Sequence, residues 1–205
     1  MTAQSTDSRE RLLDVAFKEM HQNGFAGANL ASISKGANVT KGALFHYFPT
    51  KKALLLSVVE EPIRKLLERR WIVPLRDSQD PIATIKAILN GFAAKATCES
   101  LRHGCPLQNL TIEVSALDED FRLHLSELFN RWIEVLEATL LKGIKSGKIR
   151  RQVKPRKASL FIIGSFYGAV TLGKTYQSVD FFKQCLSELG AYIESLAMSP
   201  TKAKL

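Results

Sequence analysis

Apolar residues recur at helical spacing along nearly the whole chain, and no segment alternates apolar and polar residues as a half-buried strand would. In the first long segment, for example, Leu12, Leu13, Ala16 and Met20 fall on one face of a helix. The pattern therefore predicts an all-α protein. Further helices are expected over residues 30–36, 41–48, 51–71, 81–97, 106–116, 118–146, 155–176 and 179–197.

Local signals indicate where several of these helices begin and end. Asp7 and Glu10 have the spacing of a capping box, which predicts a first helix starting after Asp7. Asn23 and Gly24 suit its end, because glycine adopts the left-handed conformation of a helix C-terminus at little cost. N-cap residues are expected before three later helices, at Asn29, Thr40 and Thr50.

Composition restricts the class of protein. The formal net charge is +9, which is compatible with a nucleic-acid partner but is not specific for one. The three cysteines predict no disulfide framework. The N-terminus has no apolar block typical of a signal peptide, and the longest uncharged run, 158–173, is too short to span a bilayer. We therefore expect a cytoplasmic protein without a membrane partner.

The first 52 residues have the organisation of a helix-turn-helix. Three short helices are expected there, and a turn at 37–40, in which Asn38 tolerates positive φ, joins the second to the third. Lys41, Lys51 and Lys52 fall in the first turns of two helices, where a cation opposes the helix dipole. That placement is favourable if phosphates bind there, so the pattern indicates DNA binding.

The residues from Leu30 to Ser34 and from Val39 to Leu54 resemble the DNA-binding signature of the TetR/AcrR family. The resemblance implies a three-helix DNA-binding domain at 1–52 and a larger helical ligand-sensing and dimerisation domain at 53–205. It implies base contacts or phosphate contacts for nine residues: Asn29, Thr40, Lys41, Gly42, Ala43, Phe45, His46, Tyr47 and Lys51. Phe45 departs from the tyrosine common in the family, which removes one hydroxyl. His46 and Tyr47 could instead pack between helices.

A short reading helix contacts few bases, so a homodimer on a near-palindromic double-stranded operator is expected. Five apolar residues near the C-terminus follow heptad spacing and predict a dimer surface, an intramolecular core, or both: Phe182, Leu186, Leu189, Ile193 and Leu196. Gly164 and Gly168, four residues apart, would allow close approach of another helix.

Cys105 is the main candidate for sensing a signal. Pro106 favours the first position of a helix, which places the Cys105 thiol at the N-cap, where the helix dipole stabilises a thiolate. The segment Gly104 to Leu107, with Asn109 and Glu113, resembles the electrophile- and oxidant-responsive, NemR-like branch of the family. Lys174 is near the position of a lysine that this branch associates with the cysteine. An inert, buried Cys105 is the alternative.

A non-covalent inducer pocket is the rival mechanism. Aromatic and polar residues on the central helices could line it: Phe92, Asn109, Glu113, Phe129, Trp132, Phe166 and Tyr167. These aromatic residues could equally be ordinary core.

Two other classes of protein fit the sequence less well. An enzyme needs a catalytic constellation, and neither the four histidines nor the glycines form one, although a helical cysteine-dependent enzyme is conceivable. Cys98, His103 and Cys105 match no common zinc spacing, so no metal and no cofactor are expected. A purely structural helical dimer would leave the lysines at the helix N-termini unexplained. The sequence thus predicts a transcriptional regulator, with repression and release by a small molecule or electrophile implied by the family.

Overall fold

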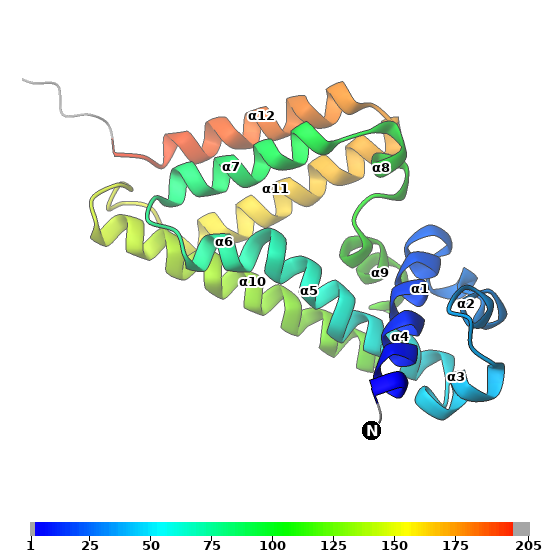
Figure 1. The fold of residues 1–205 in the computed structure, drawn as a ribbon. Coiled ribbons are helices and arrows are strands. Elements are labelled where there is room, and N and C mark those ends of the chain that lie inside the picture. Colours follow the sequence, from blue (N-terminus) through cyan, green and yellow to red (C-terminus); the bar gives the residue numbers. More distant parts are fainter. Residues whose placement is uncertain (1–2, 199–205) are drawn as a thin grey trace, which may run out of the picture. The chain divides into compact units, whose positions relative to one another are not determined.

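The computed structural model describes residues 3–198, and within them every regular element is a helix. Only an isolated bridge between Ile149 and Ala197 has strand-like pairing in this range. Figure 1 shows the helices in chain order. Their bounds are α1 Ala3–Gly27, α2 Leu30–Gly36, α3 Lys41–Tyr47, α4 Lys51–Val58, η1 Val59–Ile63, α5 Arg64–Leu67, η2 Glu68–Ile72, α6 Val73–Arg76, α7 Pro81–Lys95, α8 Cys98–His103, α9 Pro106–Val114, α10 Glu119–Lys145, α11 Pro155–Tyr176 and α12 Val179–Ser195. The predicted all-α fold is confirmed.

The chain forms two compact units. The first contains the chain up to Leu66 together with Cys105–Leu128, and the second contains Leu67–Gly104 and everything from Phe129 onward. The first unit is therefore larger than the DNA-binding domain expected at 1–52, because α9 and the start of α10 pack on it. The functional boundary after residue 52 stays a prediction.

The start of α1 differs from the prediction. The helix begins at Ala3, so Asp7 lies inside it and pairs with Arg11 one turn later instead of capping it. The end agrees better, since Gly24 leaves the helical conformation with φ 75° and ψ 179°. A short helical stretch then continues to Gly27, so glycine kinks α1 where the sequence predicted its end.

Proline explains the irregular course of the chain after Thr50. Helical conformation continues from Lys51 to Arg76, but the segment that contains Pro62 is a π-helix, η1. Proline has no N–H to donate and its ring crowds the preceding turn, so the hydrogen-bond pattern widens there. A second π segment, η2, follows at Glu68–Ile72. The helix expected over residues 51–71 is thus present, and helical conformation continues beyond it to Arg76.

The short helix α8 was not predicted. Thr97 and Ser100 cap it reciprocally, each side chain accepting a hydrogen bond from the other residue's backbone N–H. A six-residue helix contains too few apolar positions to show a periodicity, so only this capping pair could have indicated it.

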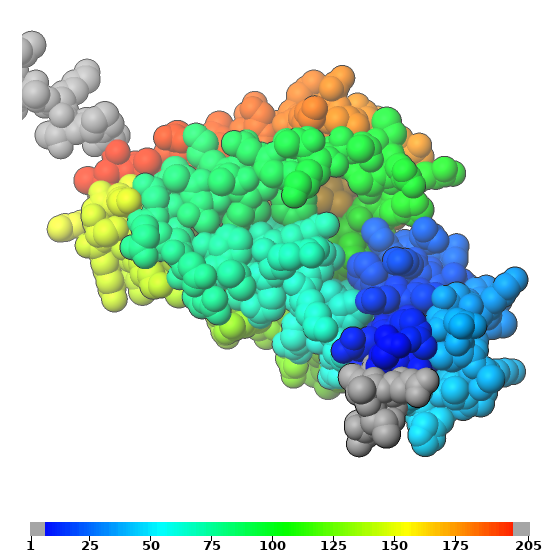
Figure 2. Space-filling view, viewed as in Figure 1, coloured from blue at the N-terminus to red at the C-terminus, as the bar shows by residue number. Residues whose placement is uncertain are grey.

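The second unit is built on the packing of α11 against α12, and of α12 against α7 (Figure 1). Gly173 of α11 lets α12 pack closely against it, because a Cβ at residue 173 would lie only 3.0 Å from the Cβ of Phe182. Figure 2 shows α12 beside α7 at the surface of this unit. The heptad residues, four on α12 and Leu196 just after its end, are buried within the single chain and so belong to an intramolecular core. They are Phe182, Leu186, Leu189, Ile193 and Leu196.

Across the described residues, no helix has both the length and the apolar character needed to cross a membrane.

Candidate functional site

The helix α2 is fixed at its start by Asn29. The side-chain oxygen of Asn29 accepts hydrogen bonds from the backbone N–H groups of Ala31, at 2.8 Å, and Ser32, at 3.3 Å. Ile33 is fully buried and anchors the inner face of the helix. The predicted cap is confirmed, and it occupies the Asn29 side chain that was expected to face DNA.

The turn from α2 to α3 has the predicted geometry. Asn38 adopts φ 53°, a left-handed conformation that asparagine tolerates better than most residues. The N–H of Val39 donates to the Ser34 carbonyl at 3.0 Å, and Arg11 Nε donates to the Ala37 carbonyl at 3.2 Å. Because Arg11 lies on α1, the first helix of the unit holds the turn in place.

The helix α3 has one buried face and one exposed face. Thr40 Oγ1 caps the helix by accepting from the Ala43 N–H at 3.1 Å. Leu44 and, just beyond the helix, Phe48 are buried in the unit. The exposed residues are Lys41, Gly42, Phe45 and His46, while Ala43 and Tyr47 are half-buried. These six positions were all expected to face DNA, and four of them form a continuous solvent face.

The exposed face carries both positive charge and aromatic surface. Phe45 is 37 % exposed, and the Lys41 ammonium lies 5.9 Å from its ring centroid. The rings of His46 and Tyr47 meet edge to face, with centroids 5.5 Å apart. An exposed large apolar residue beside a lysine at a helix start suits contact with phosphates and base edges.

The lysines at the start of α4 have partners within the chain. Lys51 Nζ donates to the Ala26 carbonyl at 2.9 Å. Lys52 Nζ forms ion pairs with Asp118, at 2.7 Å, and Asp120, at 2.6 Å, and these hydrogen bonds raise the pKa of Lys52. Phosphates are therefore not needed to explain cations at this helix start, although Lys51 can still contact one.

An ion pair that the sequence did not reveal also holds α1. Arg9 donates to the Glu61 carboxylate, with one contact at 3.1 Å, and its guanidinium lies 5.4 Å from the Phe48 ring centroid. The hydrogen bond from Arg9 lowers the pKa of Glu61. The two residues are far apart in the chain, so no local pattern could have identified the pair.

Three of the expected sensor residues belong to α9 in the first unit. Cys105 is half-buried at the N-cap, as predicted, and Asn109 is half-buried one turn later. Glu113, also expected to help line an effector pocket, accepts hydrogen bonds from the backbone N–H groups of Phe25 and Ala26.

The other three sensor candidates lie in the second unit. Trp132 and Phe166 are 1 % and 3 % exposed and pack with Trp71, whose ring centroid is 4.7 Å from that of Trp132. The indole N–H of Trp132 is buried and meets no acceptor among residues 3–198. Lys174 is half-buried, and its Nζ donates to the His103 carbonyl at 3.5 Å.

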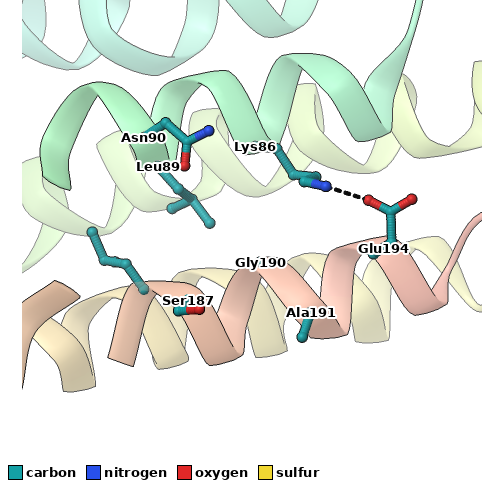
Figure 3. Close-up of a pocket in the computed structure, with 8 residues that line it drawn as sticks. Lys86, Leu89, Asn90, Ser187, Gly190, Ala191 and Glu194 are labelled. Carbon is teal, nitrogen blue, oxygen red and sulfur yellow. Dashed lines mark hydrogen bonds and ion pairs between the residues drawn. The ribbon is translucent and has the colours of Figure 1, made fainter. Parts of the chain in front are cut away.

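Two open grooves mark the surface of the second unit. One of about 330 Å³ lies between α7 and α12 and is bordered by Lys86, Asn90 and Glu194, with Lys86 paired to Glu194 (Figure 3). The other, about 400 Å³, is bordered by Arg150, Lys154, Lys157, Phe161 and Tyr192. Neither groove contains an expected sensor residue. Across the described part of the chain, no group of three or more acidic, histidine or cysteine side chains is arranged to hold a metal.

Comparison with known proteins identifies the family. Residues 12–58 match the bacterial regulatory proteins of the tetR family, and residues 81–189 match the tetracyclin repressor-like C-terminal domain. The repressor DhaR of Mycobacterium sp. strain GP1 is 27 % identical over 189 residues, which cover 89 % of this chain and 90 % of that protein. The repressor NemR of Escherichia coli K12 is 25 % identical over 200 residues, covering 95 % and 96 % of the two chains.

Solved structures show the same fold. The reduced form of E. coli NemR superposes with a TM-score of 0.83 at 24 % identity, covering 95 % of this chain and 99 % of that one. A TetR regulator from Chloroflexus aurantiacus J-10-FL gives 0.84 at 24 % identity, with coverage of 96 % and 98 %. The two family matches together span both halves of the chain. The chain therefore belongs to the tetR family of bacterial regulatory proteins, and it is a DNA-binding transcriptional regulator rather than an enzyme.

Proposed function

We propose that this protein is a cytoplasmic, homodimeric repressor that binds a near-palindromic operator through α2 and α3 and releases it when an effector acts on the protein. The observation that carries the DNA-binding part is the exposed face of α3, with Lys41, Phe45 and His46 outward and Leu44 fully buried. A helix anchored on one side and basic at its start can enter a major groove.

Within this proposal the residues of the helix-turn-helix divide into two groups. Lys41, Gly42, Ala43, Phe45 and His46 approach base edges. Thr40, Tyr47 and Lys51 contact phosphates, and Asn29 orients the start of α2. The open space around Gly42, where a Cβ would meet only the Thr40 hydroxyl at 3.9 Å, leaves room for a base to come close.

Replacing Lys41 tests this assignment. Lys41→Ala should weaken operator binding about tenfold or more in a gel-shift titration at fixed salt, because it removes a contact made at the groove. Lys145→Ala is the control, since Lys145 is also exposed but lies at the end of α10 in the second unit. Equal affinities of the wild type and Lys41→Ala would contradict the assignment.

The dimer surface in this proposal is the outer face of α11 and the start of α12. Large apolar side chains are exposed along it: Leu160, Phe161, Leu172, Tyr176 and Phe181. Added Cβ atoms at Gly164 and Gly168 would meet nothing within 4 Å, so the middle of this face is open to a second helix. Apolar surface of this extent favours burial against a second copy.

The effector in this proposal is an electrophile or oxidant that modifies Cys105. The thiol lies at the N-cap of the nine-residue helix α9 and is partly accessible. The likeness to NemR, a repressor solved in a reduced form, supports a redox signal. Cys105→Ser should keep operator affinity but lose the release that N-ethylmaleimide causes in the wild type. Full release of the serine variant by the same reagent would contradict the thiol switch.

A non-covalent effector is the second candidate, and one observation favours it. The buried indole N–H of Trp132 lacks an acceptor within the described part of the chain, which costs about 1–3 kcal/mol. An apolar effector with a hydrogen-bond acceptor could satisfy it among the surrounding aromatic rings. An inducer that releases Cys105→Ser but not Trp132→Phe would identify this mechanism.

A further inference from the structure

The carboxylate of Glu113 binds backbone N–H groups instead of another side chain. One of its oxygens accepts from Phe25 N–H at 2.8 Å, and the other accepts from Ala26 N–H at 2.9 Å. Because the two amides are adjacent in the chain, the carboxylate binds them as a bidentate pair. Hydrogen bonds to an ionised acceptor are about twice as strong as neutral ones, so this contact firmly joins α9 to the end of α1.

Gly24 makes these two amides available. Its φ of 75° breaks α1, so the following residues start a new helical turn whose N–H groups have no carbonyl behind them. A Cβ at Gly24 would lie 2.9 Å from the Glu113 carboxylate. The two residues therefore have complementary roles. The backbone conformation of Gly24 exposes the two amides and leaves room for the carboxylate, and the charged carboxylate of Glu113 binds them.

The same corner is also held by α4. Lys51 Nζ donates to the Ala26 carbonyl at 2.9 Å and lies 5.5 Å from the Phe25 ring centroid. The Phe25 ring packs edge to face on Phe121 of α10, with centroids 5.0 Å apart. We name the segment Gly24–Ala26 the α1 corner. It is thus contacted by residues of α4, α9 and α10, all within the first compact unit.

We propose that Glu113 is a positioning residue for DNA binding. Through the α1 corner its carboxylate fixes α1 and the start of α4 relative to α9, and so holds the helix-turn-helix in the arrangement that fits DNA. This inference rests on the proposed function, and it gives Glu113 a role other than effector binding. Since Cys105 is the N-cap of α9, a displacement of α9 by an effector would reach the helix-turn-helix through this contact.

The sign of the effect separates positioning from simple electrostatics. Removing a negative charge from a protein that binds DNA should, by charge alone, tighten binding. Loss of a positioning contact should weaken it, because free DNA-binding helices that are less well ordered lose more entropy on binding. We expect Glu113→Ala to bind the operator about tenfold more weakly than the wild type, with Glu113→Gln between the two because one acceptor oxygen remains.

Glu127→Ala is the matched control. Glu127 lies on α10 in the same compact unit, is exposed, and makes no ion pair with any described residue. Its replacement removes the same charge without touching the α1 corner, so operator affinity should be unchanged or slightly higher. The slope of log affinity against log salt should be the same in all these variants, since none of them removes a cation.

Amide hydrogen exchange provides a readout that does not depend on DNA. Exchange at Phe25 and Ala26 should be at least tenfold faster in Glu113→Ala than in the wild type, and unchanged in Glu127→Ala. Either unchanged exchange or unweakened operator binding in Glu113→Ala overturns the proposal. Failure of the wild type itself to bind any DNA in the same titration would instead overturn the proposed function.

Discussion

At position 24, both the backbone conformation and a side chain distant in the sequence restrict which residue can be accommodated. Two glycines of the chain, Gly24 and Gly147, have the same φ of 75°. A Cβ at Gly147 would meet nothing within 4 Å, whereas one at Gly24 would approach the Glu113 carboxylate to 2.9 Å. Gly24 therefore combines two costs for a side chain: a ψ of 179° at positive φ, a region almost restricted to glycine, and a collision with Glu113.

Alanine substitution at the two glycines measures that difference. Gly147→Ala should lower the free energy of unfolding by about 1 kcal/mol, the usual cost of positive φ for a residue with a Cβ. Gly24→Ala should cost about 1–3 kcal/mol more, because the carboxylate must move and leave two amides without an acceptor. Urea denaturation gives both values. Equal losses would show that neither the Gly24 backbone conformation nor the Glu113 contact adds to the cost of positive φ.

At the residue scale the sequence predicted chemistry that is local and missed chemistry that is distant. The caps Asn29 and Thr40 and the positive φ of Asn38 are confirmed, because each depends on a few neighbouring residues. The contact of Glu113 with Phe25 and Ala26 was not predicted, because these partners lie on α1 and no local pattern indicates them.

At the scale of helices, periodicity predicted most elements of more than one or two turns. It did not decide what the heptad residues contact: Leu186 and Ile193 of α12 are buried inside the single chain. The spacing shows that one face of α12 packs against helices, but not whether they belong to the same chain. The exposed apolar face of α11, with Leu160 and Leu172, is interrupted by glycines and so has no heptad pattern.

The ion pair between α1 and η1 makes a link between helices that depends on pH. Arg9 lowers the pKa of Glu61 below its ordinary value of 4.5, so the folded state favours the ionised carboxylate. The resulting stabilisation is complete above the unfolded pKa and is lost as the pH falls through the lower folded pKa. The wild type should therefore be more stable than Glu61→Gln near neutral pH, and this advantage should disappear in acid.

Unfolding by urea from pH 3 to pH 8 measures this dependence. The difference between the wild type and Glu61→Gln should be constant above about pH 5 and shrink below it. Glu127→Gln, at an exposed position without an ion pair to any described residue, should show a much weaker trend. A difference for Glu61→Gln that stays constant into acid would mean that the ion pair does not stabilise the fold.

At the scale of the whole molecule, regulators of this family act as dimers, so within the proposed function the apolar face of α11 matters for DNA binding as well as α3. Leu172 on this face and Leu141 on α10 are matched, since they are 40 % and 41 % exposed and both belong to the second unit. They differ in whether a second copy is expected to cover them. A charge at a covered position would be desolvated on association, whereas a charge at an uncovered one stays in water.

Leu172→Glu should therefore convert the dimer into single chains, while Leu141→Glu should remain dimeric. Sedimentation equilibrium measures the mass directly, and circular dichroism confirms that both variants keep their helices. Operator affinity should fall by about 100-fold or more in Leu172→Glu, because one reading helix loses the high effective concentration that its partner provides. If Leu172→Glu stays dimeric and Leu141→Glu does not, the two chains meet through α10 and the face of α11 is free for another contact.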